Sequence, residues 1–469
     1  MCVTLTTKSV VSNYSSTEFN RIIQNLPLPT VAIPLTQQDL SSLRTGSIPL
    51  LTSSPPQSDC RVSVVIPVRN EAENLPAVIQ ALANQVDNNG DSLNPNIYEV
   101  LVLANNCTDN TVEVARQLGN DYPLLHMHAI PVSIPLEVAH VGKARQMVMD
   151  EAYRRLSLIG RQNRIIASTD GDTQVAPDWI SALLKEFDKG VDAVGGRIIA
   201  CRSQTPEISP RVSLHYLRRI AHAYISAQIE CFLDPQSHDC WPRHFQYYGA
   251  NMAISAEMYG HIGGMPLVKD EEDVALYRQL KLADAKIRHS LEVRVRTSAR
   301  RTGRATSGLS ELLETLSNAA QHQSVLVESP EITEARILLR RYLRQIWSAL
   351  KNGHQFNVKK YVRTTELLAR SLGLSANQLQ QHTDAASTFG GLVAAISDYQ
   401  ANQIDSYCLQ PNTEISLANM RLRQRLQSIR QTSGELFDRS NDDSEPSPAI
   451  ILEALQQIQA IPLFSLAYD

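Results

Sequence analysis

The sequence predicts an α/β domain, in which a mostly parallel, Rossmann-like sheet carries helices on both faces, followed by a helical region. Three observations support this prediction. Short runs of β-branched residues alternate with amphipathic helical patterns from residue 61 to about residue 300, as in doubly wound folds. After residue 304 the apolar residues follow helical spacing only. Residues 1–60 have no strong period and end in a Ser- and Pro-rich stretch typical of a linker.

Three parts follow from these observations. We expect an N-terminal extension and linker (1–60), an α/β domain (61–304) and a helical C-terminal region (305–469). A chain of 469 residues is long enough for two or three domains of ordinary size.

The α/β domain is expected to start with a strand at 62–68, where Val and Ile dominate as in a strand buried on both faces. Asn70 is expected to cap the next helix, with Glu73 three residues later as in a capping box. The remaining elements are expected, in order, as a helix over 75–82, a strand at 98–103, a helix over 112–118 capped by Asp109, a helix at 142–156, a strand at 164–169, a helix over 179–187 and a strand at 193–199.

The C-terminal region shows one broad apolar stripe over 332–350 and helical patterns at 414–432 and 447–460. Such stripes require burial against other elements. The region contains no motif that we can connect with chemistry.

Composition excludes several classes of protein. The net charge is −4 and no long run of Lys and Arg occurs, which argues against a nucleic-acid-binding protein. The seven cysteines include no C-x-x-C pair, so we expect free thiols in a reducing cytoplasm rather than a zinc knuckle or a disulfide framework. The start of the sequence lacks the pattern of a signal peptide, and no apolar run is long enough to span a membrane. Peripheral contact with the inner face of a membrane stays open.

Two carboxylates follow the strand expected at 164–169. Asp170 and Asp172 are two residues apart, so in an extended chain their side chains point the same way. Ligands of parallel sheets bind beyond the carboxyl ends of the strands, where such a pair can hold a divalent cation together with ligand phosphates. Because Asp and Gly are also common turn residues, the pair alone is a weak signal.

A second acidic cluster lies at 270–273, directly before a helical pattern. Acidic residues favour a helix N-terminus through the macrodipole, so capping is the simpler interpretation of this cluster alone. The alternative is a general base that takes a proton from a hydroxyl group.

Together these motifs resemble the family 2 glycosyltransferases, which are inverting enzymes with the GT-A fold. The resemblance covers about residues 61–300. WPRH at 241–244 and TSAR at 297–300 resemble a bacterial branch of the family, which leaves the acceptor unassigned. The motifs that carry the resemblance are, in order, VVIPVRNE at 64–71, NNCTDNT at 105–111, TDGD at 169–172, GANMA at 249–253, IGG at 262–264 and ED at 272–273.

The resemblance implies that the loop with Pro67, Arg69 and Glu71 contacts the nucleotide. The family usually has an Asp pair at the end of the second strand, where this chain departs from the pattern with Ala104 and Asn105. We therefore count Asn105 among the nucleotide-sugar-binding residues in place of an aspartate.

Asp109 matches a later aspartate of the same family motif. The Gly-Lys pair that ends at Lys143 resembles one near the nucleotide, although a solvated lysine in the first turn of a helix is an equally good interpretation.

The resemblance also implies a metal site and a base. Asp170 and Asp172 match the family's metal and diphosphate site, so Mg²⁺ or Mn²⁺ is the expected cofactor. His289 is a candidate third metal ligand, although a histidine without a spaced partner is more often structural. Asp273 matches the catalytic base, and Glu272 lies beside it.

The expected activity is metal-dependent transfer, with inversion, of a hexose-like sugar from a UDP-, GDP- or TDP-sugar to a hydroxyl of a lipid, glycan or small-molecule acceptor. One alternative is a nucleotidyltransferase that makes an activated sugar, which usually has a Gly- and Arg-rich loop after the first strand. Another is an inactive nucleotide-sugar-binding protein. The sequence leaves the donor, the acceptor, the choice of metal and the formation of a homodimer open.

Overall fold

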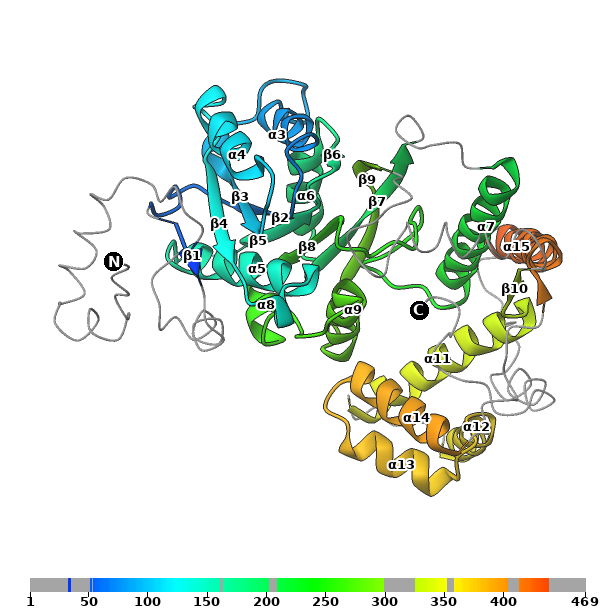
Figure 1. Ribbon diagram of the computed structural model, residues 1–469. Helices are drawn as coiled ribbons and strands as arrows, with labels where there is room; N and C mark the ends of the chain where they lie inside the picture. The colour runs from blue at the N-terminus through cyan, green and yellow to red at the C-terminus, as the bar shows by residue number, and fades with distance from the viewer. Residues whose placement is uncertain are drawn as a thin grey trace.

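The computed structural model describes residues 33–34, 51–52, 54–160, 163–201, 209–298, 325–351, 358–403 and 413–437. In these ranges the main feature is a nine-stranded sheet with the strand order β1-β4-β3-β2-β5-β8-β7-β9-β6 (Figure 1). The α/β fold predicted from the sequence is confirmed, with a helical region beside the sheet.

One half of the sheet is parallel, because helices cross from the end of each strand to the start of the next. β2, β3 and β5 are buried along their whole length, as strands covered on both faces are. The strand β1, from the N-terminal extension, pairs with the edge of β4. The strands of this half are β1 (Ile33–Pro34), β2 (Val62–Val68), β3 (Tyr98–Asn105), β4 (Met127–Ser133) and β5 (Ile165–Thr169).

The other half is mixed, which the sequence did not predict. β8 runs antiparallel to both β5 and β7, and β9 runs parallel to β7 and antiparallel to β6. As a result the end of β5 meets the start of β8, with Thr169 paired to Asn251. The TDGD and GANMA motifs therefore lie side by side. These strands are β6 (Thr173–Val175), β7 (Ala193–Cys201), β8 (Asn251–Ser255) and β9 (Ile287–Ser298).

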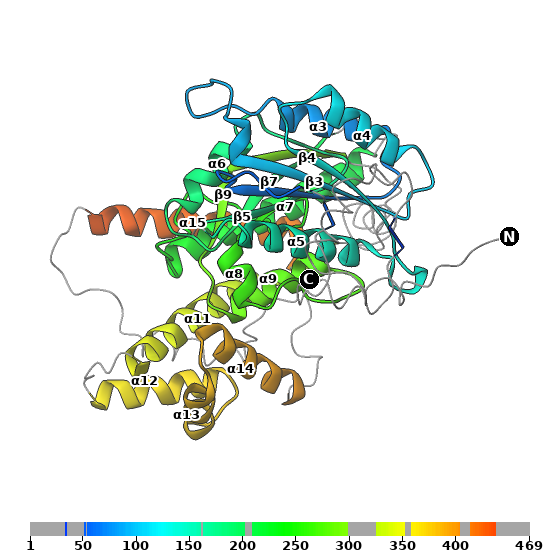
Figure 2. The same ribbon diagram turned by 90° about the vertical axis from the view of Figure 1, so that its left-hand side faces the viewer.

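Helices cover both faces of the sheet and form a separate core on each (Figure 2). On one face lie α3 (Leu75–Ala83), α4 (Thr111–Asp121) and α6 (Trp179–Phe187), and on the other α5 (Val141–Ser157), α8 (Ala256–His261) and α9 (Glu272–Leu282). Short 3-10 turns occur at η2 (Pro95–Ile97) and η3 (Leu136–Val138).

The helix after β2 lies where it was expected, but its N-cap residue differs from the prediction. Asn74, not Asn70, is the N-cap residue of α3. Asn70 has a positive φ of 56°, and its side chain accepts a hydrogen bond from the Thr108 amide at 2.8 Å. The loop after β2 is therefore fixed by the loop after β3 instead of continuing into a helix.

The helical region consists of α7, α11 and four further helices. The apolar stripe predicted at 332–350 lies in α11 and the pattern at 414–432 lies in α15, which confirms both as helices, whereas 447–460 lies outside the described residues. No helix in the described part of the chain is both long and apolar enough to cross a membrane. The elements are α7 (Pro210–Leu233), β10 (Leu326–Val327), α11 (Pro330–Lys351), α12 (Val358–Ser371), α13 (Ala376–Ala385), α14 (Phe389–Gln403), β11 (Thr413–Glu414) and α15 (Ile415–Phe437).

Helix α7 precedes residue 304 in the sequence but packs with the C-terminal helices. Ile225 and Ile229 of α7 share a core with Ile337 of α11 and Leu422 of α15. Figure 1 shows α7 and α15 side by side, away from the parallel half of the sheet. In three dimensions the helical region thus begins before the boundary expected at 304.

Candidate functional site

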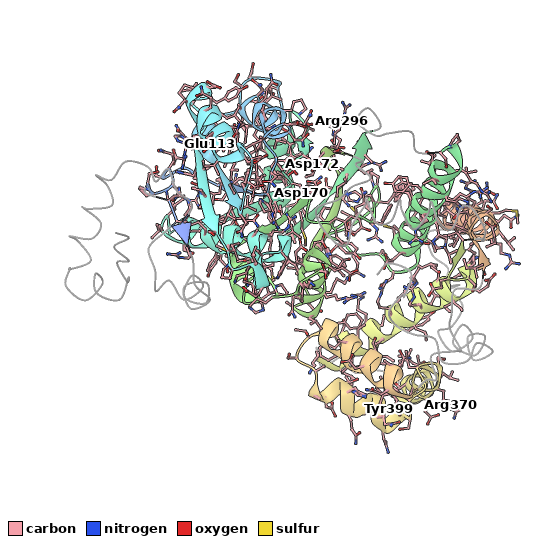
Figure 3. The ribbon with its side chains drawn as sticks, viewed as in Figure 1. Glu113, Asp170, Asp172, Arg296, Arg370 and Tyr399 are labelled. Atoms are coloured by element: carbon pink, nitrogen blue, oxygen red, sulfur yellow. The ribbon has the colours of Figure 1, made fainter. Side chains whose placement is uncertain are left out.

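The first acidic pair lies beyond the end of the central strand β5, at the carboxyl edge of the parallel strands. The side chain of Asp170 is 34% exposed and Asp172 is half-buried. A Cβ atom at Gly171, between them, would lie 2.7 Å from Val68 Cγ1 and 3.0 Å from Glu71 Cγ, so only glycine lets this turn pack against the end of β2. Figure 3 shows Asp170 and Asp172 close together in this position.

The second acidic cluster lies at the start of α9. Asp273 accepts hydrogen bonds from the Gly249 amide at 2.8 Å and from the Val274 amide at 2.8 Å. The bond from Val274 lies within the first turn of α9, whose N-cap residue Glu271 makes no side-chain capping bond. The bond from Gly249 holds the carboxylate against the segment that leads into β8.

Burial raises the pKa of Asp273, and the neighbouring Glu272 adds to this effect. The backbone hydrogen bond from Gly249 acts in the opposite direction. A carboxylate with a raised pKa is a stronger base than an ordinary aspartate once it is ionised.

A single arginine connects the two acidic clusters. Arg145 of α5 is buried and donates to Asp170 Oδ1 at 2.7 Å and to Glu272 Oε1 at 3.1 Å. It also donates to Ser168 Oγ at 2.5 Å and to the Gly249 carbonyl at 3.1 Å. Burial alone would lower the pKa of Arg145, but Asp170 and Glu272 together raise it, so the guanidinium stays charged. This arginine occupies Oδ1 of Asp170 and one oxygen of Glu272.

Glycines leave the space that this arrangement needs. A Cβ atom at Gly249 would lie 2.8 Å from Arg145 Cζ, and one at Gly142 would lie 3.1 Å from Glu272 Cβ. The sequence analysis noted the Gly-Lys pair but missed Arg145, which follows Lys143 by two residues. The available signal was a charged residue within a stretch of α5 that is otherwise buried against the sheet.

The loops after β2 and β3 are joined by Asp109. One carboxylate oxygen accepts from the Thr111 amide at 3.0 Å and the other from the Ala72 amide at 3.3 Å. Partial burial raises the pKa of Asp109, but the hydrogen bonds from Thr111 and Ala72 outweigh this and lower it. Asp109 therefore shapes the loop that contains Glu71, whose own amide donates to Thr111 Oγ1 at 2.8 Å.

The other residues expected to bind the nucleotide differ in exposure. Pro67 is buried in β2, Asn105 is buried at the end of β3, and Arg69 is exposed in the loop between them. Lys143 is buried, and its Nζ atom donates to Gln146 Oε1 at 2.9 Å. This position is inconsistent with a solvated first-turn lysine, one of the two sequence interpretations.

His289 does not join the acidic pair. It is buried in β9, where its Nδ1 atom lies 2.8 Å from Asp239 Oδ2 and its amide donates to Asp239 Oδ1 at 2.9 Å. Within the described ranges, no three His, Cys, Asp or Glu side chains come close enough to form a metal-binding group. His289 is therefore not a third metal ligand of the acidic pair. It has the structural role that the sequence also allowed, because Asp239 already holds its ring.

The comparison with known proteins gives a family match within the α/β domain. Residues 63–248 match the model of the family described as Glycosyl transferase family 2. Over 138 residues the chain is 32% identical to glycosyltransferase AglE of Haloferax volcanii. The matched segment covers 29% of this chain and 39% of that protein. The chain is 28% identical over 140 residues to dolichol-phosphate mannosyltransferase of Pyrococcus furiosus. This match covers 30% of this chain and 34% of that protein.

The chain thus spans about 39% of the length of the first of these relatives and 34% of the second. Among solved structures, a mannosyltransferase from Pyrobaculum calidifontis in complex with GDP-Man and Mn²⁺ is 13% identical and aligns over 94% of this chain and 95% of its own. Its TM-score of 0.34 is too low to support any inference about this site.

Proposed function

We propose that this chain, whose residues 63–248 belong to glycosyl transferase family 2, transfers a sugar from a nucleotide-sugar donor to an acceptor hydroxyl with inversion at the anomeric carbon. The observation that carries the proposal is the position of Arg145 between two acidic groups of different kinds. Asp170 lies at the end of β5, where phosphates of a ligand bind in such folds. Asp273 lies at the start of α9, on the far side of the arginine.

Asp273 is the proposed general base. Its neighbour Glu272 is held by Arg145, so Asp273 is the member of the pair left to accept a proton from an acceptor hydroxyl. The hydroxyl oxygen then attacks the anomeric carbon, the bond to the nucleoside diphosphate breaks, and the proton stays on Asp273. Attack from the side opposite the leaving group inverts the anomeric centre.

Asp170 and Asp172 are the proposed ligands of Mg²⁺ or Mn²⁺. Both supply the hard oxygen donors that these ions prefer, and Arg145 leaves Oδ2 of Asp170 for such an ion. A bound divalent cation would neutralise the negative charge that develops on the leaving diphosphate. The chain's own contribution is to orient Asp170 by the fixed guanidinium of Arg145.

The nucleotide is proposed to bind on the β2–β3 side of Asp170. Arg69, Glu71, Asn105 and Lys143 are the candidate contacts there, and Asp109 shapes the loop. The donor class is a UDP-, GDP- or TDP-sugar. A hexose is the expected sugar.

Two other functions compete with this one. A nucleotidyltransferase would form a nucleotide sugar from a sugar phosphate, and an inactive binding protein would hold the donor without reaction. The base proposed at Asp273 favours transfer over both, because neither alternative needs to take a proton from an acceptor hydroxyl.

A screen of UDP-, GDP- and TDP-sugars, each with Mn²⁺ or Mg²⁺, tests the proposal through the slow release of free sugar in the absence of acceptor. We expect release from one nucleotide class, abolished by EDTA.

The variant Asp172→Asn should lose most of this metal-dependent turnover, since a neutral amide replaces a charged ligand. Activity that persists in EDTA would contradict the metal assignment, and formation of nucleotide sugar from nucleoside triphosphate would favour the nucleotidyltransferase.

A further inference from the structure

We propose that Arg197 forms an anion-binding subsite for the acceptor, so that the acceptor of this enzyme carries a carboxylate or a phosphate near the hydroxyl that receives the sugar. This inference rests on the proposed function and names the class of its second substrate. It depends on four features of the structure. These are the side of the sheet on which Arg197 lies, its fixed backbone, the absence of an acidic partner among the described residues, and the charge of its described neighbours.

The strand order places Arg197 on the side of the site away from the nucleotide loops. Counting from Asp170 at the end of β5, β2 and β3 lie in one direction, and β8 and β7 lie in the other. Arg197 is in β7, just after Gly195, which pairs with Met252 of β8. Two strand spacings correspond to roughly 10 Å. This is the side on which Gly249 holds the proposed base Asp273.

The backbone at Arg197 is held on both sides, by the strand β9 on one side and by the side chains of Asn251 and Gln246 on the other. The pairing of β7 with β8 ends at Gly195. Beyond it, Asn251 Nδ2 donates to the Arg197 carbonyl at 3.1 Å, and Gln246 Oε1 accepts from the Ile198 amide at 2.8 Å. Asn251 is itself held, since it accepts from Trp179 Nε1 at 2.9 Å. A side chain on such a fixed backbone loses little freedom when it binds a ligand.

Arg197 is half-buried, yet no acidic side chain in the described part of the chain forms an ion pair with it. Other inward-facing arginines nearby are paired: Arg145 with Asp170 and Glu272, and Arg243 with Asp239. A partly desolvated cation without a counter-charge is unfavourable. A bound anion would remove this cost.

Among the residues that the structure describes, the groups that act electrostatically with Arg197 do not supply a negative charge. Burial raises the pKa of Tyr216, and burial lowers the pKa of His244 to about 3. The positive charge of Arg197 acts to lower both pKa values. His244 is fully buried and accepts from the Gln246 amide through Nδ1, so it is neutral. The nearby Asp239 is already committed to Arg243 and His289.

A second arginine lies on the same face of the sheet. Arg296 of β9 is paired in register with Ile199, two residues after Arg197, and successive residues of a strand alternate between faces. Arg296 is exposed and likewise has no ion pair among the residues described. Figure 3 shows it beyond Asp172, near the end of the sheet. Two unpaired guanidinium groups on one face favour a carboxylate or phosphate, which arginine binds through paired hydrogen bonds.

Binding of small anions tests the proposal without knowledge of the full acceptor. Inorganic phosphate and glycerate serve as probes and glycerol as the neutral control, each titrated by calorimetry with and without Mn²⁺ and the nucleoside diphosphate of the donor class. We expect wild-type protein to bind at least one anion and not glycerol. The variant Arg197→Gln should bind the anion about tenfold or more weakly, as for a lost charge-assisted hydrogen bond. The matched control Arg423→Gln removes an exposed arginine of α15 and should change nothing.

The same variant separates the acceptor from the donor. In Arg197→Gln the affinity for the nucleoside diphosphate should stay within about twofold of wild type. Equal loss of anion binding in Arg423→Gln, no anion binding by wild type, or a loss confined to the nucleotide would each overturn the proposal. Failure of the proposed function has a different signature, because then no nucleotide sugar is hydrolysed, whether or not the anion binds.

Discussion

The guanidinium of Arg145 touches Asp170 and Glu272 at once, and this has a consequence for both carboxylates. Two acidic clusters near one ligand-binding edge would repel each other and the diphosphate of a donor. A fixed cation between them lowers that repulsion and orients Asp170 without using all of its oxygen atoms. We infer that Arg145 is a positioning residue for the metal site and the base together.

Replacement of this arginine tests the inference. Arg145→Gln should lower transfer by about a hundredfold or more and destabilise the fold by about 3 kcal/mol, because the buried carboxylate of Glu272 loses its counter-charge. Thermal unfolding and steady-state kinetics measure the two effects. In the double variant Arg145→Gln with Glu272→Gln, stability should partly return while transfer stays low. Recovery of transfer together with stability would mean that Arg145 has only a structural role.

The assignment of Asp273 predicts a pH dependence. A base works in its ionised form, so transfer should fall as the pH decreases through the pKa of Asp273. Because burial raises that pKa, the fall should occur at a higher pH than it would for an ordinary aspartate. Asp273→Asn should retain binding of the nucleoside diphosphate and lower kcat by roughly a hundredfold or more. The acidic limb of the remaining activity should also disappear. A normal rate in Asp273→Asn with a loss in Glu272→Gln would move the assignment by one residue.

Several of these residues could be chosen from the sequence because their signal is local. Asp170 and Asp172 follow a strand directly, and Asp273 opens a helix. Arg145 could not be chosen in this way, since its partners are distant in the chain and meet only through the antiparallel pairing of β5 with β8. For His289 the structural role was the more frequent interpretation, but its partner Asp239 could not be named, because it is 50 residues away.

At the scale of elements, close contact between β7 and the segment before β8 defines the acceptor side. A Cβ atom at Gly195 would lie 2.4 Å from the Gln246 carbonyl oxygen, which belongs to the backbone and cannot rotate away. The Gln246 side chain of the same segment also bonds to the backbone of Ile198, the residue after Arg197. Steric fit at one glycine therefore determines where this segment runs.

We predict that Gly195→Ala destabilises the protein by about 1–3 kcal/mol, the usual cost of forcing extra volume into a packed region. Gly119→Ala in α4 is the control, since nothing lies within 4 Å of the added Cβ atom. That control should be neutral or stabilise by about 0.4–1 kcal/mol. Chemical denaturation of the two variants gives the comparison, and equal stabilities would contradict the tight contact.

The elements that the sequence predicted well are those with a strong local pattern. β2, β3, β5, β7 and the helices between them lie close to their expected positions. The strands β8 and β9 were not predicted, because their direction and partners depend on residues far along the chain. The N-cap of α3 was placed wrongly at Asn70, since the pairing of Asn70 with the loop after β3 is a tertiary contact.

At the scale of the whole molecule, the C-terminal helices are attached to the helix that carries the proposed base. The Asp284 carboxylate, just after α9, accepts from the Phe389 and Gly390 amides of α14, each at 2.7 Å. It thereby caps α14 from another element. A Cβ atom at Gly390 would lie 1.8 Å from the Lys281 carbonyl oxygen, so the two helices meet without space for a side chain.

A second connection is ionic. It runs through Glu230 of α7, which pairs both with Arg340 of α11 and with Arg243 of the segment before β8. The positive charges of Arg340 and Arg243 outweigh the effect of burial and lower the pKa of Glu230. The buried apolar stripe of α11 packs in the same region, so the helical part and the sheet are expected to unfold together.

Hydrogen exchange can test whether Asp284 joins these two parts. In the intact chain we expect α11 over 332–350 to be protected, because most of its apolar residues are buried. Asp284→Ala removes two capping bonds and should cost about 1 kcal/mol. It should speed exchange in the first turn of α14 and the last turn of α9.

Asp398→Ala, which removes an exposed carboxylate from α14 itself, serves as the matched control and should leave exchange unchanged. Equal exchange in both variants would show that the cap does not hold the parts together, and an unprotected α11 in wild type would show that the helical region is not packed at all. If transfer also falls in Asp284→Ala while the affinity for the nucleoside diphosphate is kept, the attachment at the far end of α9 contributes to the position of Asp273.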